Sequence, residues 1–158
     1  MKIKLIFTGK TTFPYLKDGI NIFEKRLAHY VPFEIITLEA AKKSAGSKNP
    51  QNQKKQEADL FMKIIKPNDY LILLDEKGKE FTSVQFAGAL QKLMASLQSN
   101  ILFVAGGAYG FDEKIYTRAN MLLSLSKMTS SHQLIRLIFL EQLYRAMTII
   151  KNEPYHHE

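Results

Sequence analysis

"NILFVAGGAYG", residues 100–110, is the stretch that decides the fold. It begins as a short uninterrupted apolar run and ends in glycines. A second apolar run of the same kind, "YLILLD", occupies residues 70–75. Strands that are apolar on both faces are typical of parallel sheets, because helices cover both faces of such sheets. We therefore expect a parallel sheet with helices packed on both sides.

Strand-like and helix-like segments alternate on either side of this stretch. We expect strands at residues 2–7, 33–38, 70–75, the start of 100–110, and 121–125. We expect helices at residues 14–30, 53–65, 83–97 and 132–151. Residues 44–52 predict a loop, and "EKGKE" at residues 76–80 predicts a turn. This alternation places the chain in the α/β class.

Composition bounds the class of protein. A chain of 158 residues with 46% hydrophobic content supports one core, so we expect a single domain over residues 1–158. The absence of cysteine excludes disulfides, thiolate zinc sites and a thiol nucleophile. The opening apolar run is far too short for a signal peptide, and no run approaches the roughly 20 residues of a membrane helix. We expect a cytoplasmic protein with no membrane partner.

The positive charge is concentrated in the first part of the chain. Residues 1–66 carry 13 basic and 6 acidic groups, whereas residues 67–158 carry 9 of each. Most of the excess lies in residues 42–66, which hold seven lysines, Glu57 and Asp59. This segment either faces the phosphates of a nucleic acid or nucleotide, or is a solvated loop. Aromatic residues do not alternate with its lysines, so we do not expect this segment to stack on bases.

Two loops follow expected strands and are candidates for binding a ligand. "AGGAYGFDE", residues 105–113, brings glycines to the carboxyl end of a strand, where α/β sheets bind ligands. It matches neither the phosphate-loop pattern nor the dinucleotide fingerprint, so a structural turn stays an alternative. The second loop, within residues 120–136, crowds Ser and Thr hydroxyls ahead of an apolar helix. These hydroxyls cap the helix or bind a polar ligand, beside the glycine loop if the fourth and fifth strands are neighbours. We interpret His132 as a helix-start residue rather than a metal ligand.

The expected helix at residues 132–151 is apolar almost all round. Such a helix must be covered on more than one side, and we expect a second subunit to cover one of them. Glu141 and Arg145 fall one turn apart on the same line as Leu134 and Ile138. They either form a self-contained ion pair, or Glu141 holds Arg145 ready for an anionic or carbonyl group.

The tail after this helix ends in groups that handle protons: Pro154, Tyr155, His156, His157 and Glu158. Chain ends are usually frayed, so disorder is one reading of this segment. Neighbouring histidines point in different directions in most conformations, and no carboxylate cluster stands nearby in sequence. We therefore expect no metal site.

Three runs together resemble one family. They are "FVAGGAYGF" (103–111), "LSLSKMTSSHQLIR" (123–136) and "LEQLYRAMTIIKNEPYHHE" (140–158). The chain resembles the ribosomal RNA large subunit methyltransferase H family, in the SPOUT class of S-adenosylmethionine (SAM)-dependent RNA methyltransferases. The resemblance implies an α/β fold with a C-terminal trefoil knot, an exception to the rule against knots. It also implies a homodimer that methylates N3 of a pseudouridine in helix 69 of 23S ribosomal RNA, on the ribosome.

The resemblance also assigns the cofactor contacts. The SAM-binding positions of the family fall on the following residues: Leu74, Gly106, Leu125, Ser126, Lys127, Met128, Thr129 and Ser130. Leu74 would take the adenine, and the backbone of both loops would bind the adenine and the ribose edge. SAM carries no phosphate, which is consistent with a glycine loop that lacks a phosphate-loop lysine.

The resemblance places the catalytic groups at the chain end. The tail would complete the active site, facing the cofactor of the other subunit. We expect His156, or a water it orients, to take the N3 proton, Tyr155 to stack on the base or bond to it, and Arg145 to stabilise charge on a carbonyl oxygen. Glu141 would orient Arg145.

Two functions from other classes are alternatives. A nucleotide hydrolase needs a metal-binding Asp and a phosphate-loop Lys at the right spacing, and neither is present. A non-catalytic ribosome- or RNA-binding protein would explain the basic first part, but it would leave the Glu141–Arg145 pair and the tail without a role. This second alternative stays open.

Overall fold

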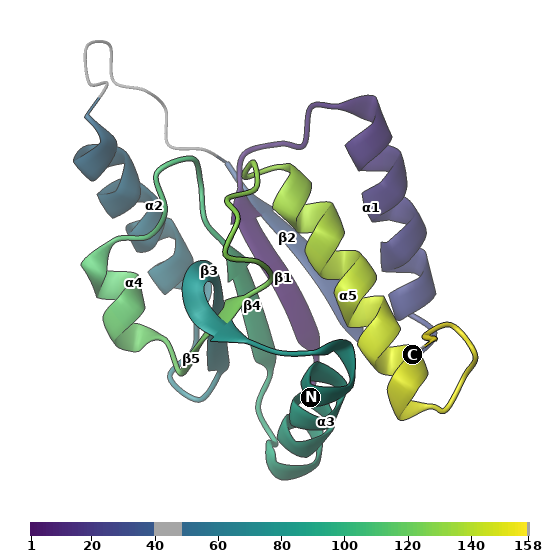
Figure 1. Ribbon diagram of the computed structural model, residues 1–158. Coiled ribbons are helices and arrows are strands. Elements are labelled where there is room, and N and C mark those ends of the chain that lie inside the picture. The colour runs from purple at the N-terminus through teal and green to yellow at the C-terminus, as the bar shows by residue number, and fades with distance from the viewer. Residues whose placement is uncertain (40–48, 158) are drawn as a thin grey trace.

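The computed structural model describes residues 1–39 and 49–157. In these residues five strands form one sheet (Figure 1), in the order β2-β1-β4-β3-β5, and every neighbouring pair is parallel. The strands are β1 (Ile3–Thr8), β2 (Phe33–Leu38), β3 (Tyr70–Glu80), β4 (Ile101–Ala105) and β5 (Met121–Ser124). The predicted α/β class with a parallel sheet is confirmed.

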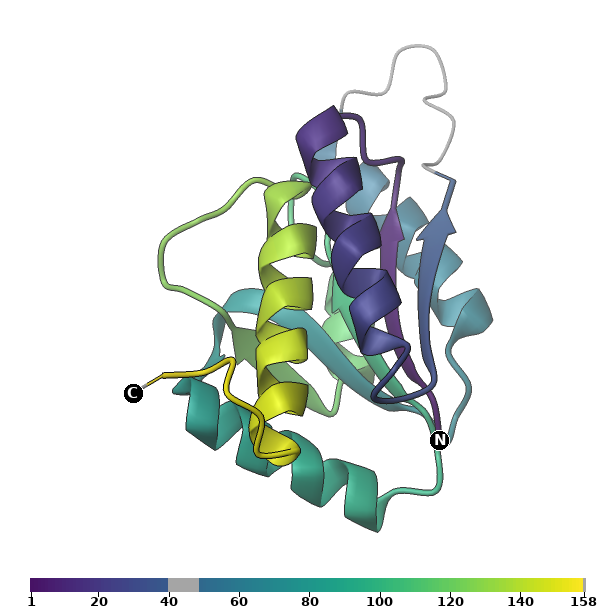
Figure 2. The same ribbon diagram turned by 90° about the vertical axis from the view of Figure 1, so that its right-hand side faces the viewer.

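Helices cover both faces of the sheet. They are α1 (Pro14–Leu27), α2 (Pro50–Ile64), α3 (Ser83–Ser96), α4 (Glu113–Arg118) and α5 (Leu134–Ile150). One core cluster joins the sheet to α1, α3 and α5, and a second joins it to α2 and α4 (Figures 1 and 2). The strand β4 serves both clusters, because Phe103 packs against Phe139 of α5 with ring centroids 4.6 Å apart while its neighbour Val104 belongs to the other cluster.

Local capping explains where several helices begin. Thr82 and Gln85 form a capping box at the start of α3. The helix α2 begins three residues before the predicted position, at Pro50, because the Asn49 side chain accepts a hydrogen bond from Gln51 N at 3.0 Å and proline suits the first helical turn. The start of the predicted loop, residues 44–48, lies outside the described residues. The short helix α4, capped by Asp112, was not predicted.

The prediction of a turn at residues 76–80 is wrong. These residues extend β3, which pairs with β5 twice across a register shift. Leu123 lies opposite Leu74 and again opposite Lys79, so the bend of β3 lies around the backbone of β5. The turn was expected from local composition, whereas the pairing depends on residues more than 40 positions away in sequence.

The helix α5 lies against the sheet between α1 and α3 (Figure 2). All its residues are described, and each is buried or half-buried within this chain. Leu134 and Ile138 are among the half-buried ones. None of the helices in the described ranges is long and apolar enough to span a membrane.

Gly78 is required by the close approach of two backbones. A Cβ atom at this position would lie 2.5 Å from the carbonyl carbon of Leu122. Backbone atoms cannot move aside as a flexible side chain can, so a larger residue must displace β3 from β5.

We expect Gly78→Ala to lower the free energy of unfolding by about 2 kcal/mol or more. Gly88→Ala is the matched control, because Gly88 lies inside α3 and its Cβ would meet nothing within 4 Å. Alanine favours a helix interior over glycine, so this variant should gain up to about 1 kcal/mol. Urea denaturation of both variants measures the difference, and equal stabilities would contradict the tight β3–β5 packing.

Candidate functional site

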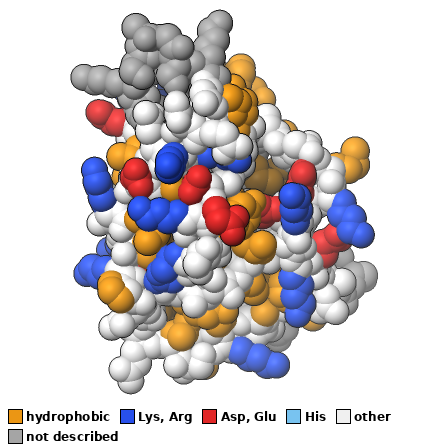
Figure 3. Space-filling model, turned by 90° about the vertical axis from the view of Figure 1, so that its left-hand side faces the viewer, with side chains coloured by type: hydrophobic (Ala, Val, Ile, Leu, Met, Phe, Trp, Pro, Cys, Tyr) orange, Lys and Arg blue, Asp and Glu red, His pale blue; other side chains and the backbone are white. Residues whose placement is uncertain are grey.

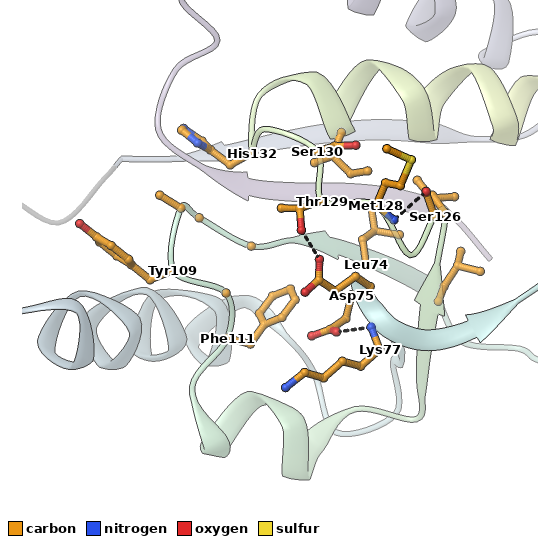
Figure 4. A pocket seen from close by; sticks show the side chains of 18 of the residues that line it. Leu74, Asp75, Lys77, Tyr109, Phe111, Ser126, Met128, Thr129, Ser130 and His132 are labelled. Atoms are coloured by element: carbon orange, nitrogen blue, oxygen red, sulfur yellow. Dashed lines mark hydrogen bonds between the residues drawn. The ribbon is translucent and has the colours of Figure 1, made fainter.

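A pocket of about 400 Å³ lies at the carboxyl ends of β4 and β5 and at the bend of β3 (Figure 4). This is the edge of a parallel sheet where ligands bind, and the volume falls in the range of small-molecule sites. Its apolar wall is formed by Leu74, Leu123, Leu125 and Ile135. Its polar lining includes Lys54, Asp75, Glu76, Lys77, Tyr116, Ser126, Thr129, Ser130 and His132.

Most of the predicted cofactor residues line this pocket. They are Leu74, Gly106, Leu125, Ser126, Met128, Thr129 and Ser130. The side chain of Lys127 does not line it: Nζ lies 3.7 Å from Glu80 Oε1 and the side chain is 86% exposed. The structure therefore does not bring the Lys127 side chain together with the other predicted cofactor residues.

The fourth and fifth strands are not neighbours. From the sequence, the glycine loop and the Ser/Thr loop were expected to lie side by side only if these strands were adjacent. The strand β3 lies between β4 and β5, because β5 pairs with β3 at the end of the sheet. The two loops nevertheless line one pocket, because the bend of β3 lies between them and contributes Leu74 and Asp75.

The hydroxyl groups of the loop before α5 have several different partners. Ser131 Oγ accepts a hydrogen bond from the N–H of Leu134, the first residue of α5, at 3.1 Å. Ser126 Oγ accepts one from Met128 N at 3.0 Å, and Thr129 Oγ1 donates to Glu76 Oε2 at 2.7 Å (Figure 4). The loop is therefore held to β3 by side chains that also line the pocket.

The glycine loop has a buried carboxylate behind it. Gly110 has a positive φ of 79° and donates its N–H to Gly107 O at 3.2 Å, which closes a tight turn. A Cβ on Gly107 would lie 2.5 Å from Oε1 of Glu57, a buried residue of α2. The loop therefore serves as a structural turn and as a wall of the pocket at the same time.

An acidic edge of the pocket was not singled out from the sequence. Asp75 and Glu76 follow the apolar part of β3, and the Tyr116 hydroxyl donates to Asp75 Oδ2. Burial, together with this hydrogen bond, raises the pKa of Tyr116 well above its ordinary value, so the hydroxyl stays a donor. The rule that ligands bind at strand ends could have identified Asp75, but its partner Tyr116 depends on the unpredicted helix α4.

The described part of the basic segment does not form a uniform positive surface. Lys and Arg side chains are interspersed with Asp and Glu on the face that carries α2 and α4 (Figure 3). Lys54 of α2 lines the pocket, which connects this segment to the candidate site. Residues 42–48 of the segment lie outside the described residues.

Arg136 is a buried charge that the sequence reading missed. It is 1% exposed, and it donates to Thr8 O at 2.8 Å, Gly9 O at 3.1 Å and Thr11 Oγ1 at 2.9 Å. Its guanidinium carbon lies 3.9 Å from the ring centroid of Phe7. Burial lowers the pKa of Arg136 to about 10, so the group remains charged at neutral pH. Arg136 thus ties the first turn of α5, which borders the pocket, to the loop after β1.

The four predicted catalytic residues come together in a second cluster. Arg145 Nη2 donates to Glu141 Oε1 at 2.7 Å, and the Tyr155 hydroxyl donates to the same oxygen at 3.0 Å. Arg145 Nη1 lies 3.1 Å from His156 Nδ1, and the Arg145 guanidinium lies 4.8 Å from the centroid of the Tyr155 ring. The tail therefore folds back onto α5.

The ion pair of this cluster is half-buried within the chain. Both the Glu141 and the Arg145 side chains are 24% exposed. Burial and the hydrogen bond to Glu141 raise the pKa of the Tyr155 hydroxyl, so this group is protonated at neutral pH. The cluster is therefore ordered and still accessible to a ligand.

The cluster and the pocket do not meet within one chain. Ile135 is the last α5 residue that lines the pocket, and no described residue from 141 onward lines it. Arg145 stands ten positions further along α5, which is about 15 Å of helix. In the described ranges, no three His, Cys, Asp or Glu side chains converge as they would around a metal ion.

Comparisons with known proteins agree with this fold and with these elements. A family model described as "Predicted SPOUT methyltransferase" matches residues 1–156. The ribosomal RNA large subunit methyltransferase H of Parabacteroides distasonis is 53% identical over 158 residues, with 100% of each chain covered. The protein of the same name from Cytophaga hutchinsonii is 50% identical over 157 residues, covering 99% of this chain and 100% of that one.

A solved structure supports the fold. The tRNA (m1G37) methyltransferase from Aquifex aeolicus superimposes with a TM-score of 0.54 at 15% identity, over 100% of this chain and 76% of that chain. The parallel sheet with its flanking helices, together with the family match, defines a SPOUT methyltransferase. Within that class the chain belongs to the ribosomal RNA large subunit methyltransferase H family.

Proposed function

We propose that this protein transfers a methyl group from SAM to N3 of a pseudouridine in helix 69 of 23S ribosomal RNA. The proposed setting is the assembled ribosome in the cytoplasm. The observation that carries the proposal is the cluster of Glu141, Arg145, Tyr155 and His156, which the fold assembles from α5 and the tail. The relatives named as ribosomal RNA methyltransferases support the substrate class.

The pocket fits the methyl donor. Its apolar wall around Leu74 suits an adenine ring, and the carboxylates of Asp75 and Glu76 at its rim suit hydroxyl or ammonium groups. SAM supplies an electrophilic methyl group on a sulfonium. The task left to the protein is to align the base and remove its N3 proton.

The hydrogen bonds of the cluster favour one division of roles. A guanidinium only donates, so His156 Nδ1 accepts from Arg145, and the proton of the neutral imidazole lies on Nε2. With Arg145 in place, Nδ1 of His156 is engaged and Nε2 is buried within the chain, so we propose that His156 positions Arg145 rather than acting as the expected proton acceptor. The Tyr155 hydroxyl, bonded to Glu141, can take the N3 proton while its own proton passes to the Glu141 carboxylate.

We also propose a homodimer in which the tail of one subunit completes the pocket of the other. Two observations support this arrangement: the pocket and the catalytic cluster are separated within one chain, and the half-buried residues of α5 include the apolar Leu134 and Ile138. A helix with an apolar outer face needs a further covering partner.

The C-terminal trefoil knot belongs to the same proposal. The bend of β3 around β5 supports it, because Leu123 pairs with both halves of the bend and Gly78 touches the backbone at Leu122. If the C-terminal part of the chain passes through this bend, the chain is threaded through its own loop and forms a knot. The chain would form a single domain over residues 1–158.

Calorimetric titration with SAM, followed by transfer of labelled methyl from SAM to ribosomes lacking the modification, tests the function. We expect saturable SAM binding, no binding of ATP or NAD, and one methyl group incorporated in helix 69. A protein that binds ribosomes without transferring methyl would instead support the non-catalytic alternative. Heat of binding with ATP but not with SAM would instead support the nucleotide hydrolase.

The proton route is tested with Tyr155→Phe and His156→Gln. Tyr155→Phe should lower kcat about 100-fold, the scale of a lost general base, with SAM affinity unchanged. Raising the pH should restore part of this rate, because hydroxide then removes the N3 proton in solution. His156→Gln keeps an acceptor for the Arg145 guanidinium and should lose only a few-fold; a loss as large as that of Tyr155→Phe would make His156 the proton acceptor.

The shared site is tested by mixing two inactive subunits. Gly106→Val should block the pocket, since a Cβ there already lies 3.2 Å from the Phe111 ring, and it should abolish SAM binding. Co-expressed with Tyr155→Phe subunits, it should form mixed dimers with one intact site, giving about a quarter of wild-type activity if subunits pair at random. Activity no higher than that of the separate variants would place both halves of the site in one chain.

A further inference from the structure

A second concave site, of about 320 Å³, lies next to the folded tail. It is formed where the end of α1 approaches the end of α5, which lie beside each other in Figure 2. Its lining residues are Arg26, His29, Tyr30, Tyr144, Lys151 and Glu153. Neither the resemblance nor the comparisons assign a role to this site.

The walls of this site are aromatic and cationic. The rings of Tyr30 and Tyr144 meet edge to face with centroids 5.8 Å apart. The Arg26 guanidinium lies 5.4 Å from the Tyr144 ring centroid and 5.4 Å from that of Phe23. Aromatic rings with an adjacent guanidinium are the groups that proteins use to hold unstacked nucleotides.

The charge of the site favours an anion. Arg26 and Lys151 are exposed cations, and Glu153 is the one carboxylate among the lining residues. The Glu153 carboxylate accepts a hydrogen bond from the Tyr30 hydroxyl at 2.5 Å. This bond raises the pKa of Tyr30 above its ordinary value, so the hydroxyl stays protonated and bonded to Glu153.

The site is continuous with the catalytic cluster. The Tyr144 ring meets the Tyr155 ring edge to face with centroids 4.8 Å apart, and the Tyr155 hydroxyl bonds to Glu141. Tyr144 is therefore a wall shared by the two sites. A nucleotide held here would lie one aromatic ring away from the proposed reacting base.

We propose that this site binds the RNA nucleotide adjacent to the target pseudouridine. Its phosphate would lie between Arg26 and Lys151, and its base or ribose would lie against Tyr144. The inference rests on the proposed function, and it makes this surface a part of substrate recognition.

The test compares Lys151→Gln with Lys92→Gln. Both lysines are exposed, but Lys92 lies on α3, on the other side of α5 from α1. Binding to ribosomes that lack the modification is measured over a range of salt concentrations, together with KM and kcat. Lys151→Gln should raise the KM for ribosomes about fivefold and make the slope of log affinity against log salt shallower by about 1. Lys92→Gln should change neither.

A second variant and two controls make the outcome decisive. Arg26→Gln should also raise the ribosome KM, whereas SAM affinity and the unfolding midpoint of the Lys151 variant should equal those of wild type. An unchanged KM and salt slope in Lys151→Gln, with an active wild type, would overturn this inference and leave the proposed function intact. A wild-type protein that transfers no methyl would overturn both.

Discussion

The pairing of β3 with β5 is the constraint on which the candidate site depends. The fifth strand joins the sheet through β3, and the bend of β3 doubles their contact through the register shift at Leu123. The loop that follows β5 is held to the same bend by the hydrogen bond from Thr129 to Glu76. If this pairing were lost, the pocket would lose two of its walls while the rest of the sheet could remain.

The helix α5 connects the pocket to the cluster formed by Glu141, Arg145 and the tail. Its first turn borders the pocket. Arg136 anchors this turn, because its guanidinium donates hydrogen bonds to the carbonyl oxygens of Thr8 and Gly9 at the end of β1. Its later turns carry Glu141 and Arg145, and the tail folds back onto them. A rigid helix separates these groups within one chain, which is why we propose that a second subunit brings the tail to the cofactor pocket.

The fold class and the pocket loops were predictable because they follow from local pattern. Apolar runs such as residues 70–75 must be buried on both faces, and glycines after a strand mark a close approach of backbone and ligand. The Glu141–Arg145 pair was likewise predictable, because helical periodicity alone places residues four apart on one face. Their association with Tyr155 and His156 came from the family resemblance, since helical periodicity stops before the tail.

What the sequence alone determined is therefore the five strands and the four longer helices, the parallel sheet and the loops at its carboxyl edge, since burial and backbone geometry act over a few residues. Only the tertiary structure decided the bend of residues 76–80, the Tyr116–Asp75 contact and the burial of Arg136. Tyr116 and Asp75 are 41 positions apart, and Arg136 bonds to Thr8 across 128 positions. Such contacts depend on how the strands are ordered in the sheet. Strand order is a property of the whole fold, and local composition does not predict it.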